Sequence, residues 1–316
     1  MRMHFRSMAA VFALAALGAC TIADVTEAGG DDVLVVEAVL RTDRPEQRIL
    51  LHRSVRGALS PGEPGAEVFV TGNGGARYRF EMVNSSQCIT VDPLYANADS
   101  VDLQASCYRS LGSYGYWVNP DSVYDLTVVT TRGETARGRT HVPAPYAILQ
   151  FPYRSRLRDG PRECTVPGNT PLPIVWTQSR GAYGYLAPLR ITGLDRVAPD
   201  SISAPAELEL TGLAVSSSDT TLVLPTDFGI FDRFSLDQRL LRYLRTGLPP
   251  GVRADVVIAA ADRNYINGVR GGSFNPSGQV RISSVVGDGR GVFGSLVPLY
   301  LSFNLGQPNA QIACNA

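Results

Sequence analysis

The sequence contains no lysine and only three histidines. All 29 basic residues are therefore arginines, and they balance the 29 acidic residues to a formal net charge of +0. Without lysine, the chain has no Schiff-base nucleophile, no Ser–Lys dyad and no phosphate-binding loop of the Walker type. The balanced charge also provides no positive field to collect nucleic acid, so we expect no nucleic-acid partner.

Histidine is too scarce for the usual metal and general-base sites. Beyond His4 near the N-terminus, only His52 and His141 occur, each within a strand-like pattern and without an acidic or cysteine neighbour at ligand spacing. No Gly-x-Ser-x-Gly nucleophile motif is present. We therefore expect no metal, no cofactor and no catalytic residue, and we interpret both histidines as structural.

Beyond its N-terminus the chain lacks any stretch that is apolar and long enough to span a bilayer. At the N-terminus, Arg2 and Arg6 precede an apolar run from 8 to 17, which is the layout of a secretory signal. The run ends in Leu17-Gly18-Ala19-Cys20, which resembles the lipobox of bacterial lipoproteins. The resemblance implies that the Cys20 sulfur receives a diacylglycerol and that Cys20 becomes the mature N-terminus. An ordinary signal peptide with a cysteine near its cleavage site is the alternative.

Such an anchor predicts a soluble body held to a membrane by two or three acyl chains. Residues 1–19 are the predicted lipoprotein signal peptide, and residues 20–32, which include Gly29-Gly30, are the predicted lipid-anchored flexible linker. Thr21 stands where an aspartate would favour retention at the inner membrane. We therefore expect an outer-membrane lipoprotein of the cell envelope that faces either the periplasm or the cell surface.

Cysteine is sparse, and the number is even once Cys20 is set aside. Four of the five cysteines remain, which favours disulfides in an oxidising envelope. We favour the pairs Cys88–Cys107 and Cys164–Cys314, because each then stays inside one predicted domain. The spacing alone also allows the other two pairings, or four free thiols.

Residues 33–145 are predicted to form an N-terminal β-sandwich, since no stretch of helical period occurs there. A hairpin is expected from Ala66 to Met82, turning at Gly72-Asn-Gly-Gly75. In its return strand, Tyr78, Phe80 and Met82 alternate with charged residues and should face the core. The other strand-like segments of this part are Val33–Leu40, Arg48–Arg53, Val123–Thr130 and Thr140–Val142.

A long, poorly periodic segment, residues 84–119, separates the hairpin from the next strand. The predicted Cys88–Cys107 disulfide would staple it into an ordered loop. Aromatic side chains on such a loop either stack on a sugar or partner, or pack beneath the loop. The candidate ligand-binding residues are therefore Tyr95, Tyr108, Tyr114 and Trp117.

The prolines at 143 and 145 mark a predicted boundary, so that residues 146–316 form a C-terminal β-rich domain. One helix is expected from an N-cap at Ser235 with Gln238 as its capping-box partner to Gly247, and it should pack on its own sheet. A short helical turn capped by Asp262 and a hairpin turn at Gly287–Gly291 are also expected. The predicted strands are Leu172–Gln178, Tyr183–Ile191, Glu207–Thr211, Asp255–Ala260, Gln279–Ser284, Val292–Val297 and Leu299–Phe303. The predicted fold class is mainly β: two β-sandwich-like domains, with one or two short helices in the second.

Three short C-terminal segments resemble the closing signature of a family of bacterial envelope lipoproteins. They are Asn264-Tyr265-Ile266, Ser283 to Asp288, and Gly291-Val292-Phe293-Gly294-Ser295. The family is known as domain of unknown function 4249 (DUF4249), and the likeness spans most of residues 20–305. It implies a β-rich outer-membrane lipoprotein without catalytic residues to carry over. Members are often encoded near TonB-dependent receptors, so the resemblance makes such a receptor a candidate partner.

We therefore predict a lipid-anchored, non-enzymatic binding or accessory lipoprotein associated with TonB-dependent outer-membrane uptake. Its membrane contact is the N-terminal lipid, and its small ligand is not specified by any motif. A glycan-acting envelope hydrolase is one alternative, because two carboxylates placed in space leave no signature in a sequence. A purely structural envelope lipoprotein is the other.

Overall fold

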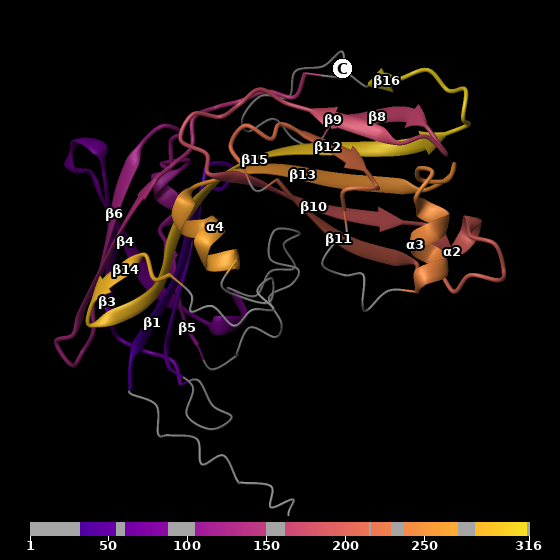
Figure 1. The fold of residues 1–316 in the computed structure, drawn as a ribbon. Coiled ribbons are helices and arrows are strands. Elements are labelled where there is room, and N and C mark those ends of the chain that lie inside the picture. Colours follow the sequence, from indigo (N-terminus) through magenta and orange to yellow (C-terminus); the bar gives the residue numbers. More distant parts are fainter. Residues whose placement is uncertain are drawn as a thin grey trace, which may run out of the picture.

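The computed structural model describes residues 32–54, 61–87, 105–149, 162–214, 216–228, 237–270 and 282–314. The predicted signal peptide, Cys20 and the linker up to residue 31 lie outside these residues. The described chain is mainly β, as predicted, and its ribbon forms two lobes that meet near helix α4 (Figure 1).

The N-terminal lobe is built from seven consecutive strands and three short 3-10 turns. The turns are η1 (Asn73–Gly75), η2 (Ser85–Gln87) and η3 (Gly112–Tyr114). The strands are β1 (Leu34–Arg41), β2 (Arg48–Arg53), β3 (Glu67–Gly72), β4 (Arg77–Val83), β5 (Ser106–Ser110), β6 (Val123–Val129) and β7 (Thr135–His141).

The remaining elements form the C-terminal lobe and return to complete the first. The helices are α2 (Leu194–Val197), α3 (Gln238–Leu244) and α4 (Arg263–Arg270). The strands are β8 (Arg162–Pro167), β9 (Leu172–Val175), β10 (Gly184–Thr192), β11 (Glu207–Ala214), β12 (Thr221–Leu224), β13 (Arg253–Ala261), β14 (Val285–Gly287), β15 (Gly289–Gly306) and β16 (Ala313–Cys314).

One 14-stranded sheet runs through both lobes, and strand β15 joins them. The first half of β15 pairs in parallel with β1, from Gly289 opposite Leu34 to Leu296 opposite Arg41. Its second half pairs antiparallel with β13 and in parallel with β8. Residues 285–296 therefore complete the lobe that begins at residue 34. The division of the chain into two domains at residue 145 stays a prediction. Strand β15, which follows that boundary, belongs to both lobes.

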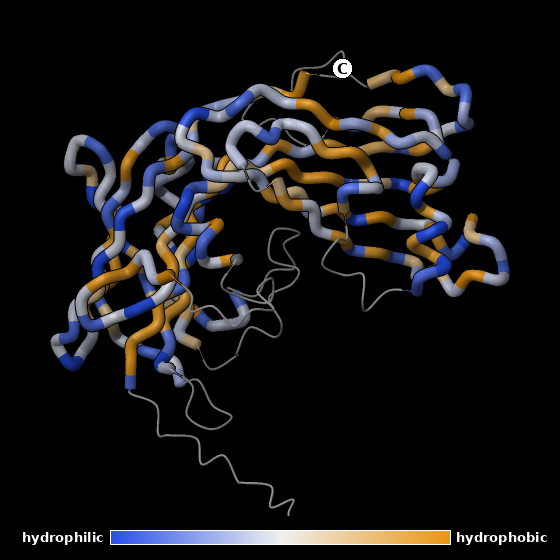
Figure 2. The backbone as a smooth tube through the Cα atoms, viewed as in Figure 1, coloured by the Kyte–Doolittle hydropathy of each residue, from blue (hydrophilic) through white to orange (hydrophobic). Residues whose placement is uncertain are grey.

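The C-terminal lobe has two layers. Strands β11, β10, β13, β15, β8 and β16 belong to the large sheet, and β9 and β12 form a separate two-stranded sheet. Buried side chains from both sheets belong to one apolar cluster, which includes Ile174 and Trp176 from the β9 segment and Leu189 and Phe303 from the large sheet. Apolar residues are nearly continuous along β13 and the middle of β15 (Figure 2), because both faces of these strands are covered.

The predicted hairpin is present, with one correction to its faces. Strands β3 and β4 pair antiparallel, and Gly74 and Gly75 in the turn adopt positive φ. Phe80 is buried, but Met82, which should face the core, has 54% of its surface exposed. Met82 pairs with Tyr108 of β5 near the C-terminal end of β4.

The segment from 84 to 119 is not simply a long loop. Its residues 106–110 form β5, which pairs with both β2 and β4 and so lies inside the sheet. The prediction was wrong here because Ser-Cys-Tyr-Arg-Ser offers only two apolar side chains, too few for a period of two to be recognised.

Three local predictions near the helices and the C-terminal turn also need correction. Helix α3 is capped by Asp237, whose Oδ1 accepts from the Arg239 amide at 2.7 Å, rather than by Ser235, which lies outside the described residues. Residues 282–284 of the predicted strand are not strand. The turn at Gly287–Gly291 is not a hairpin turn, since β14 pairs with β7 whereas β15 pairs with β1. Among the described residues, no helix has the length and apolar character needed to cross a membrane.

Candidate functional site

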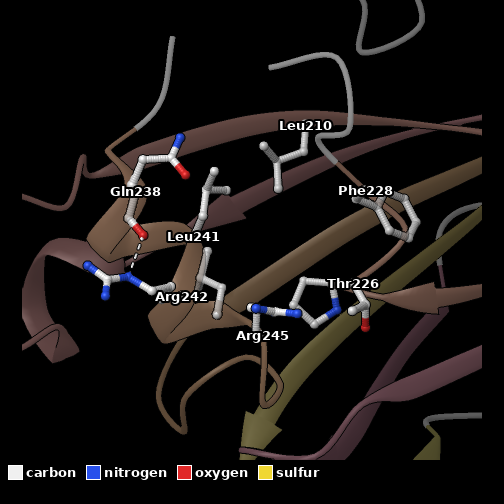
Figure 3. A pocket seen from close by; sticks show the side chains of 9 residues that line it. Leu210, Thr226, Phe228, Gln238, Leu241, Arg242 and Arg245 are labelled. Carbon is white, nitrogen blue, oxygen red and sulfur yellow. Dashed lines mark hydrogen bonds between the residues drawn. The ribbon is translucent and has the colours of Figure 1, made fainter. Parts of the chain in front are cut away.

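The C-terminal lobe carries a cleft of about 290 Å³ between helix α3 and the turn that follows β12. Leu210 of β11 and the turn after β12 form one side, and α3 forms the other with Gln238, leucine and arginine side chains (Figure 3). The lining residues are Leu210, Pro225, Thr226, Phe228, Gln238, Leu241, Arg242, Leu244 and Arg245.

The apolar side of the cleft is held by the turn after β12. Asp227 closes this turn, because its Oδ2 accepts from the Val223 amide at 2.8 Å. Phe228 then bridges to Gly212 of β11, and a Cβ at Gly212 would lie 3.2 Å from the Phe228 ring. The absence of a side chain at Gly212 thus lets the ring lie across β11, beside Leu210.

The arginine side of the cleft follows from how α3 docks. Leu240 and Leu244 are buried, as the predicted packing of the helix on its own sheet requires. The helix ends where Gly247 adopts a φ of +121°, and a Cβ there would lie 2.2 Å from the Thr170 amide nitrogen. This docking leaves Arg242 and Arg245 exposed over the cleft.

The two arginines give the cleft a positive character. Arg242 Nε donates to the backbone carbonyl of Gln238 at 3.3 Å. Within the part of the chain that the structure describes, neither Arg242 nor Arg245 forms an ion pair. The other polar lining groups are the Thr226 hydroxyl and the Gln238 amide, and neither titrates near neutral pH. The arrangement can hold an anion next to apolar atoms.

The four candidate ligand-binding aromatics do not form one exposed site. Tyr95 lies outside the described residues. Tyr108 is 1% exposed, and its hydroxyl donates to the Glu63 carbonyl at 2.7 Å and accepts from the Ala66 amide at 2.9 Å. Burial raises the pKa of Tyr108. Its ring is enclosed in the core and offers no face to a ligand.

Tyr114 and Trp117 come together with other aromatic rings, but mostly beneath the surface. Trp117 is 4% exposed and stacks on Tyr78, with ring centroids 4.0 Å apart. Tyr114 meets the same Tyr78 ring edge-on at 5.3 Å, and Tyr124 meets Trp117 at 5.6 Å. The cluster packs β4 against β6 and the segment after β5, so Trp117 has a core role and only Tyr114 is partly accessible.

The remaining predicted site residues are structural where they are described. A disulfide joins Cys164 of β8 to Cys314 of β16. Cys107 is disulfide-bonded as well, whereas its predicted partner Cys88 lies outside the described residues, as does Cys20. Within the described ranges no group of three or more His, Cys, Asp or Glu side chains is placed to hold a metal ion.

The segments that carry the family resemblance converge at the junction of the two lobes. Asp262, which precedes α4, is the predicted cap: its Oδ1 accepts from the Tyr265 amide at 2.9 Å and from the Ser295 amide of β15 at 3.2 Å. Its Oδ2 lies 2.7 Å from the Thr140 hydroxyl of β7. Burial is the main cause that raises the pKa of Asp262. A buried carboxylate thus ties α4, β7 and β15 together.

The rest of the resembling residues complete this junction. Asn264 Nδ2 donates to the Arg139 and Phe293 carbonyls at 2.7 and 2.9 Å. The Ser283 hydroxyl accepts from the Gly291 amide at 3.0 Å, and the Ser284 hydroxyl accepts from the Phe293 amide at 2.8 Å. The polar groups of these side chains form hydrogen bonds with the backbone. The segments therefore stabilise the junction of the two lobes in the described chain.

Sequence reasoning did not identify the cleft. Arg242 and Arg245 were recognisable as polar positions of a helix, but their partners in the cleft, Leu210 and Phe228, lie on other elements. The only available signal was the absence of an acidic residue within α3 to balance its arginines.

The similarity of this chain to known proteins is low. No protein-family model matches it, and no curated protein matches it. Among solved structures, the crystal structure of the chicken CNTN1 FN1–FN3 domains is similar over 87% of this chain and 66% of that chain. This chain thus spans just under two thirds of that structure, with 12% sequence identity and a TM-score of 0.18, which is too low to carry an argument.

Proposed function

We propose that this chain is a non-enzymatic binding lipoprotein of the bacterial outer membrane, related to the DUF4249 family and accessory to TonB-dependent uptake. The observation that carries the binding role is the cleft beside α3. Two arginines without ion-pair partners among the described residues, Arg242 and Arg245, line this cleft together with apolar side chains. No lining side chain is suited to general acid–base or nucleophilic catalysis at neutral pH, so a binding role fits this cleft better than hydrolysis.

The proposed membrane attachment rests on the lipobox, and the start of the folded body is compatible with it. The Asp32 carboxylate accepts from Arg132 at 2.9 Å, and its backbone carbonyl accepts from Arg53 at 3.4 Å. Arg53 is buried and also pairs with Glu63 and Glu134, and its hydrogen bond with Glu134 is the main cause that raises its pKa. A tether that ends at residue 31 would therefore join the folded body at Asp32, which these hydrogen bonds hold in place.

Metabolic labelling with an alkyne-tagged fatty acid tests the attachment. We expect the wild-type chain and the matched control Thr21→Ser to incorporate the label, because both keep the cysteine of the lipobox. Cys20→Ser should lose the label and accumulate as an uncleaved or soluble precursor, with no mature protein in the membrane fraction. Label retained in Cys20→Ser would contradict the lipoprotein proposal.

Crosslinking in living cells, followed by detergent extraction and mass spectrometry, tests the uptake association. Repeated recovery of one TonB-dependent receptor with the wild-type chain, and its loss with Cys20→Ser, is the expected result. Recovery of lipid alone would contradict an accessory role in uptake while leaving the anchor intact.

A further inference from the structure

We propose that the cleft beside α3 binds small amphipathic carboxylates, with the carboxylate on Arg242 and Arg245 and the apolar part on Leu210 and Phe228. This inference rests on the proposed binding function and specifies its ligand. It assigns a role to the two arginines of α3 that face the cleft.

The charge of the cleft selects an anion. Helix α3 contains Arg239 and Arg242 and no acidic residue, and Arg245 follows as its C-cap. The Asp237 carboxylate caps the opposite end of the helix, where it accepts from the Arg239 amide. Arg245 reaches toward Thr226, whereas Arg242 lies beside the Gln238 carbonyl (Figure 3). The two arginines lie three positions apart on the helix surface, so the exposed Arg242 side chain can turn to meet Arg245 at one anion. A guanidinium donates in a fork that matches the two oxygens of a carboxylate.

The wall opposite the arginines selects an apolar body. Leu210 and Phe228 are almost fully buried, and Pro225 completes this surface. A ligand with charges at both ends would have to desolvate one of them against these side chains, which is costly without a partner. The ligand should therefore carry its charge at one end only.

The size of the cleft limits the ligand. A volume of about 290 Å³ is at the lower end of the range for small-molecule sites. It admits one aromatic ring or a short aliphatic chain with its carboxylate, and it excludes polymers and folded domains. 4-Phenylbutyrate has this shape, and 4-phenylbutyramide is the neutral compound of nearly equal size.

Calorimetric titration of the full chain in a nonionic detergent, with detergent blanks, tests the inference with these two probes. Phenylbutyrate should bind, and the amide should bind about tenfold more weakly or not at all, as expected for the loss of a charge-assisted hydrogen bond. The double variant Arg242→Gln/Arg245→Gln should lose about tenfold in affinity for the acid and little for the amide.

Two further variants separate the charge from the apolar wall. Arg137→Gln removes the same charge from an exposed position on β7 and should leave both affinities unchanged. Leu241→Gln, at a half-buried lining position, should weaken both probes equally.

The outcomes also distinguish this inference from the proposed function. Equal affinity for acid and amide, or an unchanged affinity in the double arginine variant, would overturn the carboxylate assignment while leaving the cleft a binding site. If neither probe binds at millimolar concentration, both the proposed ligand class and the proposed binding role of the cleft are wrong. The fatty-acid labelling at Cys20 would still report on the anchor independently.

Discussion

The Asp262 carboxylate at the junction of the lobes provides the sharpest test of the structure. Asp262→Ala would leave the Ser295 and Tyr265 amides without their acceptor. An unsatisfied buried donor costs about 1–3 kcal/mol, so the two together should lower the free energy of unfolding by about 2–6 kcal/mol. The hydroxyl of Thr140 would also lose a partner, but it can turn to Ser295 Oγ at 2.8 Å.

Asp262→Asn should behave very differently. The amide keeps an oxygen for both backbone donors, and its NH₂ group can donate to Thr140 Oγ1 while that hydroxyl donates to Ser295 Oγ. The substitution also removes a charge that burial penalises. We therefore expect the cost of Asp262→Asn to be below about 1 kcal/mol near neutral pH.

The pH dependence follows from the raised pKa of Asp262. A folded-state pKa above the model value of 3.8 means that the folded chain binds the proton more tightly than the unfolded chain. The contribution of this group to stability is therefore full below pH 3.8 and declines as the pH rises through the raised pKa. Asp262→Asn lacks this decline, so the stability of the variant relative to wild type should increase as the pH rises from 3.8 through the raised pKa.

Guanidinium-induced unfolding of the oxidised protein at several pH values measures the cost of each substitution and its pH dependence. Because the free energies of unfolding are compared with those of wild type, the contributions of the other titrating groups cancel. An Asp262→Asn variant that is as unstable as Asp262→Ala at pH 8 would refute the reasoning, since it would show that the negative charge itself is needed.

Three further substitutions test other parts of the fold. Gly247→Ala should lower the free energy of unfolding by about 2–5 kcal/mol, because the residue needs positive φ and its Cβ would meet Thr170; near-wild-type stability by chemical denaturation would contradict the docking of α3. Burial alone would raise the pKa of Asp43, but hydrogen bonding and charge from the buried Arg41 outweigh it and lower the pKa. Asp43→Asn should therefore cost about 3 kcal/mol at neutral pH. This difference from wild type should shrink as the pH falls through the lowered pKa, because protonation then removes the charge from wild type as well; a loss that is independent of pH would count against an ionised pair. Cys314→Ser opens a loop with a sequence separation of 150 and should cost about 2–5 kcal/mol in thermal or chemical unfolding; a reductant should then destabilise this variant further only by breaking the disulfide at Cys107, and equal stability of variant and wild type before reduction would contradict the prediction.

Local patterns in the sequence predicted local structure well. The β-prone residues of Val33–Leu40 and the hairpin glycines predicted β1 and the β3–β4 turn, and Asp262 was recognisable as a helix cap. These features depend on residues close together in the chain. Strand β5 was not predicted, because its five residues contain only two apolar side chains.

Features that depend on distant residues were not predictable in the same way. Nothing in the local pattern of β15 shows that its first half pairs with β1 and its second half with β13. The cleft likewise combines Leu210 with Arg245, two residues from separate elements. Burial of Trp117 depends on Tyr78 and Tyr124, which a linear reading of the loop aromatics cannot place.

The shared strand β15 has a consequence for the order in which the chain can mature. Strand β1 is among the first parts of the body to be synthesised, yet its parallel partner begins only at Gly289. Until those last residues are available, the edge of β1 stays open and the N-terminal lobe lacks Phe293 in its core. Pairing over so long a sequence separation is slow. A chain truncated before residue 289 should therefore remain protease-sensitive throughout, whereas both lobes of the full chain should be resistant.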